Sequence, residues 1–340
     1  MLTLLLLSCR GPDPAPNPPV TDVSTEASAD TGVGSTAPTA ATGHTGTLPG
    51  TVTDPSLPLY QGPALLSETE LYADIGTETL ADGVVAYDLR YPLWSDGSQK
   101  RRWLFVPVGE TIDTTDPDEW VFPVGTVAFK EFVRDGVRVE TRRFAKLADG
   151  WDYGTYLWRA DGSDADFVNG PLPNVLGTEH DVPERAACIR CHEGIVDRFL
   201  GVEAVQLPVE QQQLLPLTAT VQASVPGKGT VQEALGLLHS NCGNCHQAGA
   251  LAAEETDLLL DLRVADVDPG AVHAVTTGVG TATKHDIGGT SINIVAGDPE
   301  ASQLWVRMGM RGLLGMPPVG GEVPDEAGQQ VVGDWIRSLP

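Results

Sequence analysis

The sequence has few cysteines and few basic residues, and it has no long apolar run. Its 340 residues include 21 Lys and Arg against 46 Asp and Glu, which gives a formal net charge of −25. Acidic residues outnumber basic ones in 1–58, 59–230 and 231–340 alike, so no segment offers the basic surface that binds nucleic acid or anionic lipid. No stretch approaches the roughly 20 apolar residues of a membrane-spanning helix. We therefore expect no nucleic-acid partner and no transmembrane span.

Several catalytic motifs are also missing. The chain has no glycine-rich phosphate-binding loop, no G-x-S-x-G nucleophile elbow and no H-E-x-x-H zinc motif. The apolar content of 41% is nevertheless sufficient for a packed core. The length predicts two domains and a tail, and the five cysteines carry most of the functional information.

The N-terminus resembles a bacterial lipoprotein signal. Residues 1–9 read M-L-T-L-L-L-L-S-C, and the last four resemble a lipobox, whose cysteine is lipidated. Two or more acyl chains on Cys9 would anchor the protein stably, which predicts a lipoprotein in the bacterial periplasm or on the cell surface. The alternative is that Cys9 is an ordinary thiol. Because no basic residue precedes the apolar run, we expect the true start codon to lie upstream.

Residues 10–58 consist mainly of Thr, Pro, Ala, Gly and Asp, with few large apolar side chains. Such a stretch cannot bury enough area to offset its ordering entropy. We expect a disordered tether.

Residues 59–229 are expected to form a β-rich domain that ends in the first of two cysteine motifs. Short runs rich in β-branched and aromatic residues recur at 103–106, 127–133, 137–141 and 156–158. Asp135-Gly136, between two of these runs, is a hairpin turn signal. We predict an antiparallel β-sandwich over roughly 60–185. Its aromatic residues are interpreted as core, with an aromatic binding face as the alternative.

Four of the five cysteines form two C-x-x-C-H motifs, Cys188 to His192 and Cys242 to His246. This motif is typical of c-type haem attachment. The two thiols reach the two vinyl groups of one porphyrin, and the adjacent histidine coordinates the iron. With 5 Cys and 7 His, one such motif arises by chance on the order of once in a thousand chains of this length. We predict two covalently attached haem c groups, at Cys188, Cys191 and His192 and at Cys242, Cys245 and His246.

Two other uses of these cysteines are open. One tetrahedral zinc ion would take all four thiols, since paired C-x-x-C is also a zinc signature. A C-x-x-C redox pair is the other alternative. The long separation between the two pairs exceeds the usual zinc spacing, and zinc does not explain a histidine after both pairs. Haem is therefore the favoured interpretation.

Residues 230–340 predict an all-α, cytochrome c-like domain around the second motif. An apolar helix over 234–238 leads into Cys242, and a second helix begins at Pro299 behind an Asp298 N-cap. A terminal helix over 325–339 has one apolar face and is expected to pack across the first. The expected fold class is thus α+β and multidomain, an antiparallel sandwich-like domain followed by an all-α domain.

Met316, in the sequence M-P-P, is the predicted sixth ligand of the second haem. A thioether opposite histidine raises the reduction potential of haem iron. The alternative is a core methionine. For the first haem, no spacing rule selects a sixth ligand, and the candidates by residue type are His180, His239, His273, His285, Met308 and Met310.

The basic residues cluster in two places, 100–102 and 142–143. They are candidates for pairing with haem propionates or with a redox partner. A solvated strand face is the simpler interpretation.

The chain resembles a group of bacterial di-haem c-type proteins over about residues 60–340. The motifs shared in the same order are 91–97 (Y-P-L-W-S-D-G), 100–103, 122–126, 150–151, 188–192, 206–207, 241–246 and 316–318. That group combines an N-terminal β-region with a C-terminal cytochrome c domain. The resemblance implies haem at Cys188/Cys191/His192 and at Cys242/Cys245/His246, and it implies no established substrate.

These features together predict an exported, lipid-anchored electron-transfer protein. Its acidic surface favours a redox partner with a basic patch. One alternative is a di-haem redox enzyme, peroxidase-like or an oxidase of a small molecule, in which one haem iron is open. Another is a non-redox envelope binding module.

Overall fold

The computed structural model describes residues 59–340 except 193–196, 198, 313 and 319. These residues belong to one unit of the chain, Gly50–Pro340. The predicted lipobox with Cys9 and the predicted tether over 10–58 lie outside the described residues.

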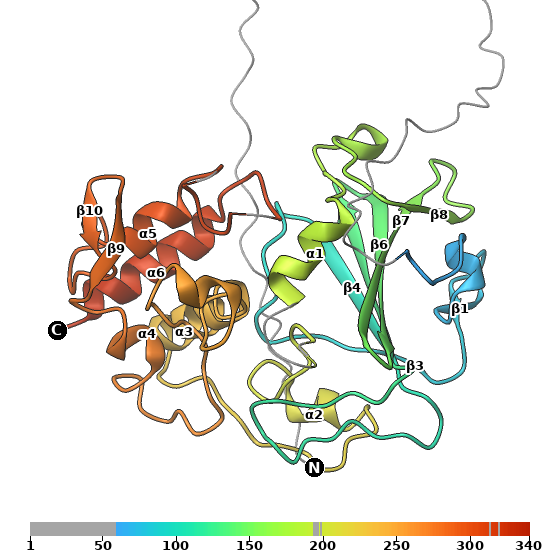
Figure 1. Cartoon of the computed structure of the whole chain (residues 1–340), viewed down its shortest axis with the longest axis horizontal. Helices are drawn as coiled ribbons and strands as arrows, with labels where there is room; N and C mark the ends of the chain where they lie inside the picture. The colour runs from blue at the N-terminus through green and yellow to red at the C-terminus, as the bar shows by residue number, and fades with distance from the viewer. Residues whose placement is uncertain (1–58, 193–196, 198, 313, 319) are drawn as a thin grey trace, which may run out of the picture. The chain divides into compact units, whose positions relative to one another are not determined.

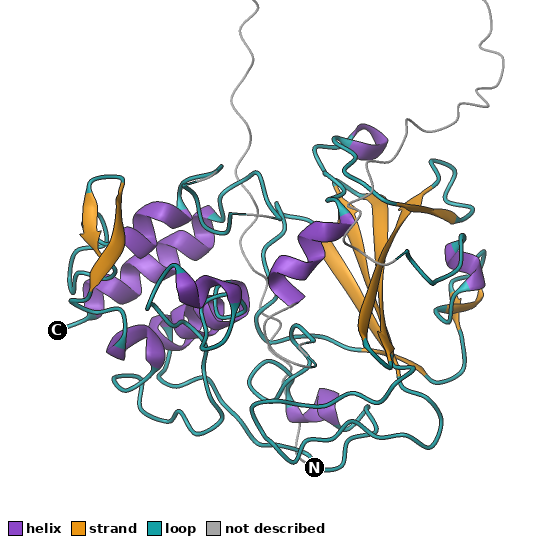
Figure 2. Cartoon of the chain, in the orientation of Figure 1, coloured by secondary structure: helices purple, strands orange, loops and turns teal. Residues whose placement is uncertain are grey.

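A six-stranded antiparallel sheet is the main β-element of the described residues (Figure 2). Its strands pair in chain order, and their bounds are β3 Val84–Ala86, β4 Gln99–Phe105, β5 Val127–Arg134, β6 Val137–Leu147, β7 Gly150–Trp158 and β8 Ala165–Val168. A two-stranded ribbon precedes it, formed by β1 Tyr72–Asp74 and β2 Thr79–Leu80.

The hairpin predicted from Asp135-Gly136 is confirmed. The two residues join β5 to β6 with φ values of 51° and 79°. Positive φ at both central positions matches the right-handed twist of the flanking strands. The turn therefore sets the register with which β5 and β6 begin to pair.

The predicted β-sandwich is wrong, because the described strands of this region form that sheet and the short ribbon. The two faces of the sheet are covered differently (Figure 1). The ribbon and its flanking segment cover one face, with a core that includes Leu71, Trp103 and Phe129. Helix α1, Arg185–His192, lies on the opposite side. Strand alternation predicts that a face is covered, but it does not distinguish a second sheet from helices and loops.

The predicted all-α domain over 230–340 is also wrong, because this region contains a β-hairpin. Strands β9 Ala282–Ile287 and β10 Thr290–Ile292 pair through Gly288-Gly289, both with positive φ. The helices here are α3 Thr230–Asn241, α4 His273–Thr276, α5 Gln303–Met308 and α6 Glu326–Ser338. Two of them span only four and six residues. A further short helix, α2 Val209–Gln212, precedes this region.

The helix expected to begin at Pro299 begins at Gln303 instead. The Ser302 amide donates to the Pro299 carbonyl, and the Asp298 carboxylate accepts from the Ala301 amide. Asp298 therefore caps a turn rather than a helix, as short acceptor side chains often do.

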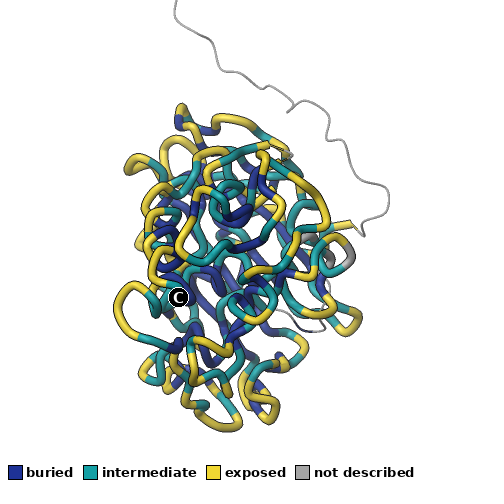
Figure 3. Tube along the Cα trace, turned by 90° about the vertical axis from the view of Figure 1, so that its left-hand side faces the viewer, coloured by how far each residue is buried: buried dark blue, intermediate teal, exposed yellow. Residues whose placement is uncertain are grey.

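Helices α3 and α6 share one apolar core, as expected from their apolar faces. Leu235 and Leu238 of α3 pack with Val332, Trp335 and Ile336 of α6. Asp325 caps α6 through the Gly328 amide. Buried positions run through the interior of this region, and exposed positions concentrate in its connecting loops (Figure 3). Among the described residues, no helix combines the length and the apolar composition needed to cross a bilayer.

The segment 91–97 joins the sheet region to the C-terminal region. The Trp94 amide donates to the Asn241 side-chain oxygen at 2.6 Å, and the Trp94 indole donates to the Val323 carbonyl at 2.9 Å. The Asp96 carboxylate accepts from the amides of Glu322 and Val323 at 2.9–3.0 Å. Asp96 has φ 51°, a conformation that Asp and Asn tolerate better than most residues. We call these contacts the Trp94–Asp96 clamp.

We expect Asp96→Ala to lower the free energy of unfolding by about 1–3 kcal/mol, because two amides lose a charged acceptor. Asp96→Asn should lose less, since it keeps one acceptor oxygen and the positive φ. Denaturant unfolding monitored by tryptophan fluorescence measures the change.

Asp74→Ala is the matched control, because the Asp74 carboxylate also accepts from two amides, but only within its own exposed turn. Limited proteolysis should show faster cleavage near 320 in Asp96→Ala and not in Asp74→Ala. Equal cleavage in both variants would contradict the clamp.

Candidate functional site

A cavity of about 1090 Å³ lies between the sheet and the C-terminal region. This exceeds the roughly 300–1,000 Å³ of ordinary small-molecule sites. Its walls come from β4, β5 and β6, from α1, from the end of α3, from α5 and from the loop around Met316. The Trp94–Asp96 clamp lies at this boundary, since Trp94, Asp96, Asn241 and Glu322 all line the cavity.

All seven residues predicted to bind the cofactors line this one cavity. They are Cys188, Cys191, His192, Cys242, Cys245, His246 and Met316. The first three lie on α1, and Cys242 is the C-cap residue that follows α3. The amides of Cys245 and His246 both donate to the Cys242 carbonyl, so the second motif forms one tight turn. Two motifs that are about 50 residues apart in the sequence thus face the same space.

The His246 ring has one nitrogen engaged with the backbone. Nδ1 lies 3.0 Å from the Leu258 carbonyl oxygen, which fixes Nδ1 as the protonated nitrogen. A hydrogen bond of this kind orients a metal-binding imidazole and leaves Nε2 as the donor. Burial lowers the pKa of His246, so the ring is neutral at pH 7 and suited to coordinate a metal ion.

The His192 ring packs against two aromatic side chains of the sheet. Its centroid lies 4.8 Å from Phe144, with the rings nearly parallel, and 5.4 Å from Tyr153. Strands β6 and β7 therefore set the position of the first motif's histidine.

The Cys188 and Cys242 side chains are half-buried, and desolvation by the surrounding protein raises the pKa of both thiols, that of Cys242 to about 12. The four motif cysteines are present as thiols. Redox-active cysteine pairs have a lowered thiol pKa, so the environment of Cys188 and Cys242 does not match that of a dithiol redox pair.

Only some of the candidates for the sixth ligand of the first haem line the cavity. His180 and Met308 line it, whereas His239, His273, His285 and Met310 do not. Both ring nitrogens of His180 are engaged, Nδ1 with Ser98 Oγ at 3.3 Å and Nε2 with Glu140 at 2.8 Å. Coordination by His180 would require one of these contacts to break.

The basic cluster 100–102 does not act as one group. Arg101 faces the side of the sheet that carries the ribbon, where its guanidinium donates to Glu131 and Glu78. Arg102, on the other face, lines the cavity together with Lys130 and Arg142. Lys130 was not singled out from the sequence, because only the register between β4, β5 and β6 brings it beside the other two.

The residues around the cavity fit covalently attached tetrapyrroles. Thiols are present in two pairs, each followed by a histidine, and His246 keeps Nε2 for a metal. The Arg102 side chain is buried, and its Nη2 has no hydrogen-bond partner among the described residues, which matches an anionic substituent on the ligand.

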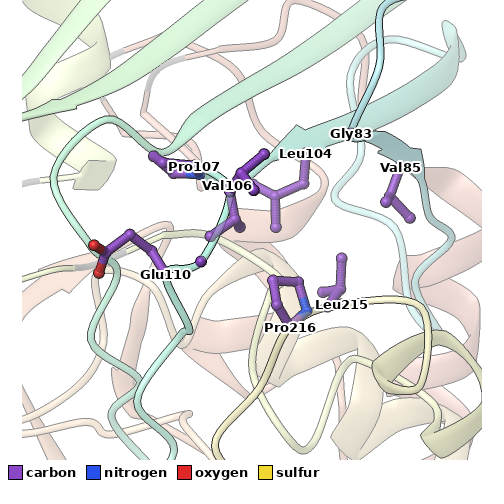
Figure 4. Close-up of a pocket in the computed structure, with 10 residues that line it drawn as sticks. Gly83, Val85, Leu104, Val106, Pro107, Glu110, Leu215 and Pro216 are labelled. Carbon is purple, nitrogen blue, oxygen red and sulfur yellow. The ribbon is translucent and has the colours of Figure 1, made fainter.

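A second, smaller cavity of about 200 Å³ lies at the end of β3 and β4 (Figure 4). Its lining is mostly apolar, including Val85, Leu104, Val106 and Leu215, with Glu110 at its rim. None of the predicted site residues lines it, so it offers no alternative site for the cysteine chemistry.

Comparison of the chain with models of protein families, with curated proteins and with solved structures gives no match. Within the described residues, no group of three or more His, Cys, Asp or Glu side chains is arranged to hold a metal ion. A haem iron needs no such group, because the porphyrin supplies four of its ligands.

We expect the stability of the protein to rise with pH above 7 because of Lys100. Burial lowers the pKa of its ammonium from 10.5 to about 7, and Arg102 and Arg142 contribute to the shift. Between these two pH values the unfolded chain binds more protons than the folded one, so the free energy of unfolding increases with pH.

Lys100→Met should reduce this increase, measured by denaturant unfolding at pH 7 and pH 9. Lys228→Met, at an exposed position, is the control and should retain the wild-type slope. A Lys100→Met slope equal to that of the wild type would exclude Lys100 as its source.

Proposed function

We propose that this protein is an exported, lipid-anchored di-haem c-type cytochrome that transfers electrons between redox partners of the bacterial envelope. The single observation that carries the proposal is the cavity, on which both C-x-x-C-H motifs open. The resemblance to bacterial di-haem c-type proteins points the same way. The lipid anchor rests on the lipobox-like sequence ending at Cys9.

In this proposal, Cys188 and Cys191 would hold one haem and Cys242 and Cys245 the other. His192 and His246 would each ligate one iron, and Met316 would be a further ligand of the iron bound by His246. A c-type haem supplies one-electron redox chemistry at its iron. The protein's part is to fix position and environment. The Leu258 carbonyl orients His246, and Phe144 and Tyr153 support His192.

The arrangement suits electron transfer, because haems held by two motifs that line one cavity would share that cavity. The chain carries a net charge of −25, which favours a redox partner with a basic patch and predicts that association weakens with salt.

A second candidate function is a di-haem enzyme, peroxidase-like or an oxidase of a small molecule. It is favoured by the state of His180, whose two ring nitrogens are both engaged by Ser98 and Glu140. An open position on the first iron would then be available to a substrate, and the His180 imidazole, which lines the cavity and contacts Glu140, would serve proton transfer.

The first test is a haem count. The chain from Ser56 onward is expressed behind an export signal in cells with the cytochrome c maturation machinery. Intact mass and an alkaline pyridine spectrum should give two covalent haems, and carbon monoxide is then added to the reduced protein. Absence of carbon monoxide binding supports electron transfer, and binding to one haem supports the enzyme. A protein with no covalent haem would overturn both.

Met316→Ala should leave both haems attached and open one iron to carbon monoxide. It should also lower the reduction potential of that haem, because the thioether ligand is lost. Potentiometric titration and the carbon monoxide spectrum measure both effects.

Met310→Ala, outside the cavity lining, is the matched control and should behave like the wild type, and Met308→Ala tests the other methionine of the cavity wall. A Met316→Ala protein with wild-type spectra and ligand binding would show that Met316 is not an axial ligand.

A further inference from the structure

Three basic residues lie side by side across the sheet on the wall of the cavity. Arg102 of β4 is directly opposite Lys130 of β5, and Lys130 is directly opposite Arg142 of β6. All three line the cavity. We call them the cation row. Burial and the neighbouring cations lower the pKa of Lys130 well below its usual range. Since like charges at directly opposed positions destabilise a sheet, the row is a costly arrangement.

The carboxylates of the described residues balance only part of this charge. Glu140 pairs with Arg142, with Nε at 3.1 Å, and it also contacts His180. No described carboxylate lies within ion-pair distance of Arg102 or Lys130. Arg102 is only 7% exposed, and its Nη2 has no hydrogen-bond partner among the described residues.

The unpaired basic residues of the cation row are unexpected in a chain with this net charge. With 46 acidic residues against 21 basic ones, carboxylates to neutralise three basic residues are abundant. Yet the carboxylates that line the cavity, including Asp96, Asp181, Glu203 and Glu322, do not lie within ion-pair distance of Arg102 or Lys130. A buried, unpaired guanidinium is unfavourable unless an anion reaches it.

The surroundings of the row define the rest of the ligand. Phe132 lies under Lys130 and Arg142, at 5.4 Å and 4.5 Å from the cations, and Phe144 continues the same face. The thiols of Cys188 and Cys191 are close enough to interact electrostatically with Arg142. The site therefore combines an anion-binding edge with an apolar, aromatic floor beside the first cysteine motif.

We propose that the cation row Arg102–Lys130–Arg142 binds a carboxylate carried on an apolar body inside the cavity. The planar guanidinium fork of Arg102 matches a carboxylate in a bidentate arrangement. The carboxylate has two sources, a propionate of a haem attached at Cys188 and Cys191 or a free aromatic or aliphatic carboxylate. The first source rests on the proposed function, and the second does not.

The test uses the exported protein as purified, with its haem content measured first. Benzoate is the probe, benzamide is its neutral analogue and inorganic phosphate is the competing anion, each titrated by calorimetry. The variants are Arg102→Gln and Lys130→Gln. Arg159→Gln is the matched control, because Arg159 pairs with Asp166 at an exposed site outside the cavity lining. Circular dichroism confirms folding of each variant, and Lys130→Gln carries the test if Arg102→Gln does not fold.

If the row binds a free carboxylate, we expect benzoate to bind and benzamide not to bind. Its affinity falls about tenfold or more in Arg102→Gln and Lys130→Gln, as expected for a lost charge-assisted hydrogen bond, and is unchanged in Arg159→Gln. If the bound carboxylate is a haem propionate, it already occupies the cation row, and the haem-loaded protein does not bind benzoate. The pH at which the reduction potential of one haem changes then rises by about one unit in Arg102→Gln, a tenfold change in proton affinity.

The proposal is overturned if benzoate does not bind and that pH is unchanged, or if phosphate binds in preference to benzoate. A protein without covalent haem contradicts the proposed function but leaves the benzoate titration as a full test of the cation row.

Discussion

The Asp96 carboxylate makes the contact on which the cavity depends. It accepts hydrogen bonds from two successive amides, of Glu322 and Val323, that belong to the far end of the chain. Trp94, two residues earlier, fixes Asn241 beside the second cysteine pair. One short segment thus holds both a predicted attachment site and the loop of Met316 against the sheet. A separate hydrogen bond, from the Val264 amide to the Asp118 carboxylate, joins the same two regions elsewhere.

Local signals predicted the elements of the fold better than its layers. The Asp135-Gly136 hairpin and the helices α3 and α6 follow from positive φ, capping and apolar periodicity, which are properties of neighbouring residues. The predictions of a sandwich and of an all-α domain were wrong because both depend on which element packs against a given face of a sheet or helix. The local sequence does not contain that information. Gly288-Gly289 was a hairpin signal that could have been recognised in the sequence, whereas the turn at Asp298 shows that a capping residue does not by itself start a helix.

The predicted site residues came from spacing, and the structure adds the groups that spacing cannot reveal. The two C-x-x-C-H motifs are recognisable in any fold, but their common cavity depends on long-range packing. The cation row is invisible in the sequence, since Arg102, Lys130 and Arg142 lie on three strands and only register aligns them. Arg101 and Arg102 are neighbours in the chain but lie on opposite faces of the sheet. In an acidic protein, buried basic residues therefore indicate an anion-binding site better than the abundant carboxylates indicate a cation-binding site.

The position of the clamp in the chain has a consequence for the order of assembly. Its acceptor, Asp96, precedes all four motif cysteines in the chain, and its donors at 322–323 follow them. Because a chain is synthesised from its N-terminus, the clamp cannot form until all four cysteines have left the ribosome. The four thiols are therefore accessible on the growing chain before this wall of the cavity is held in place.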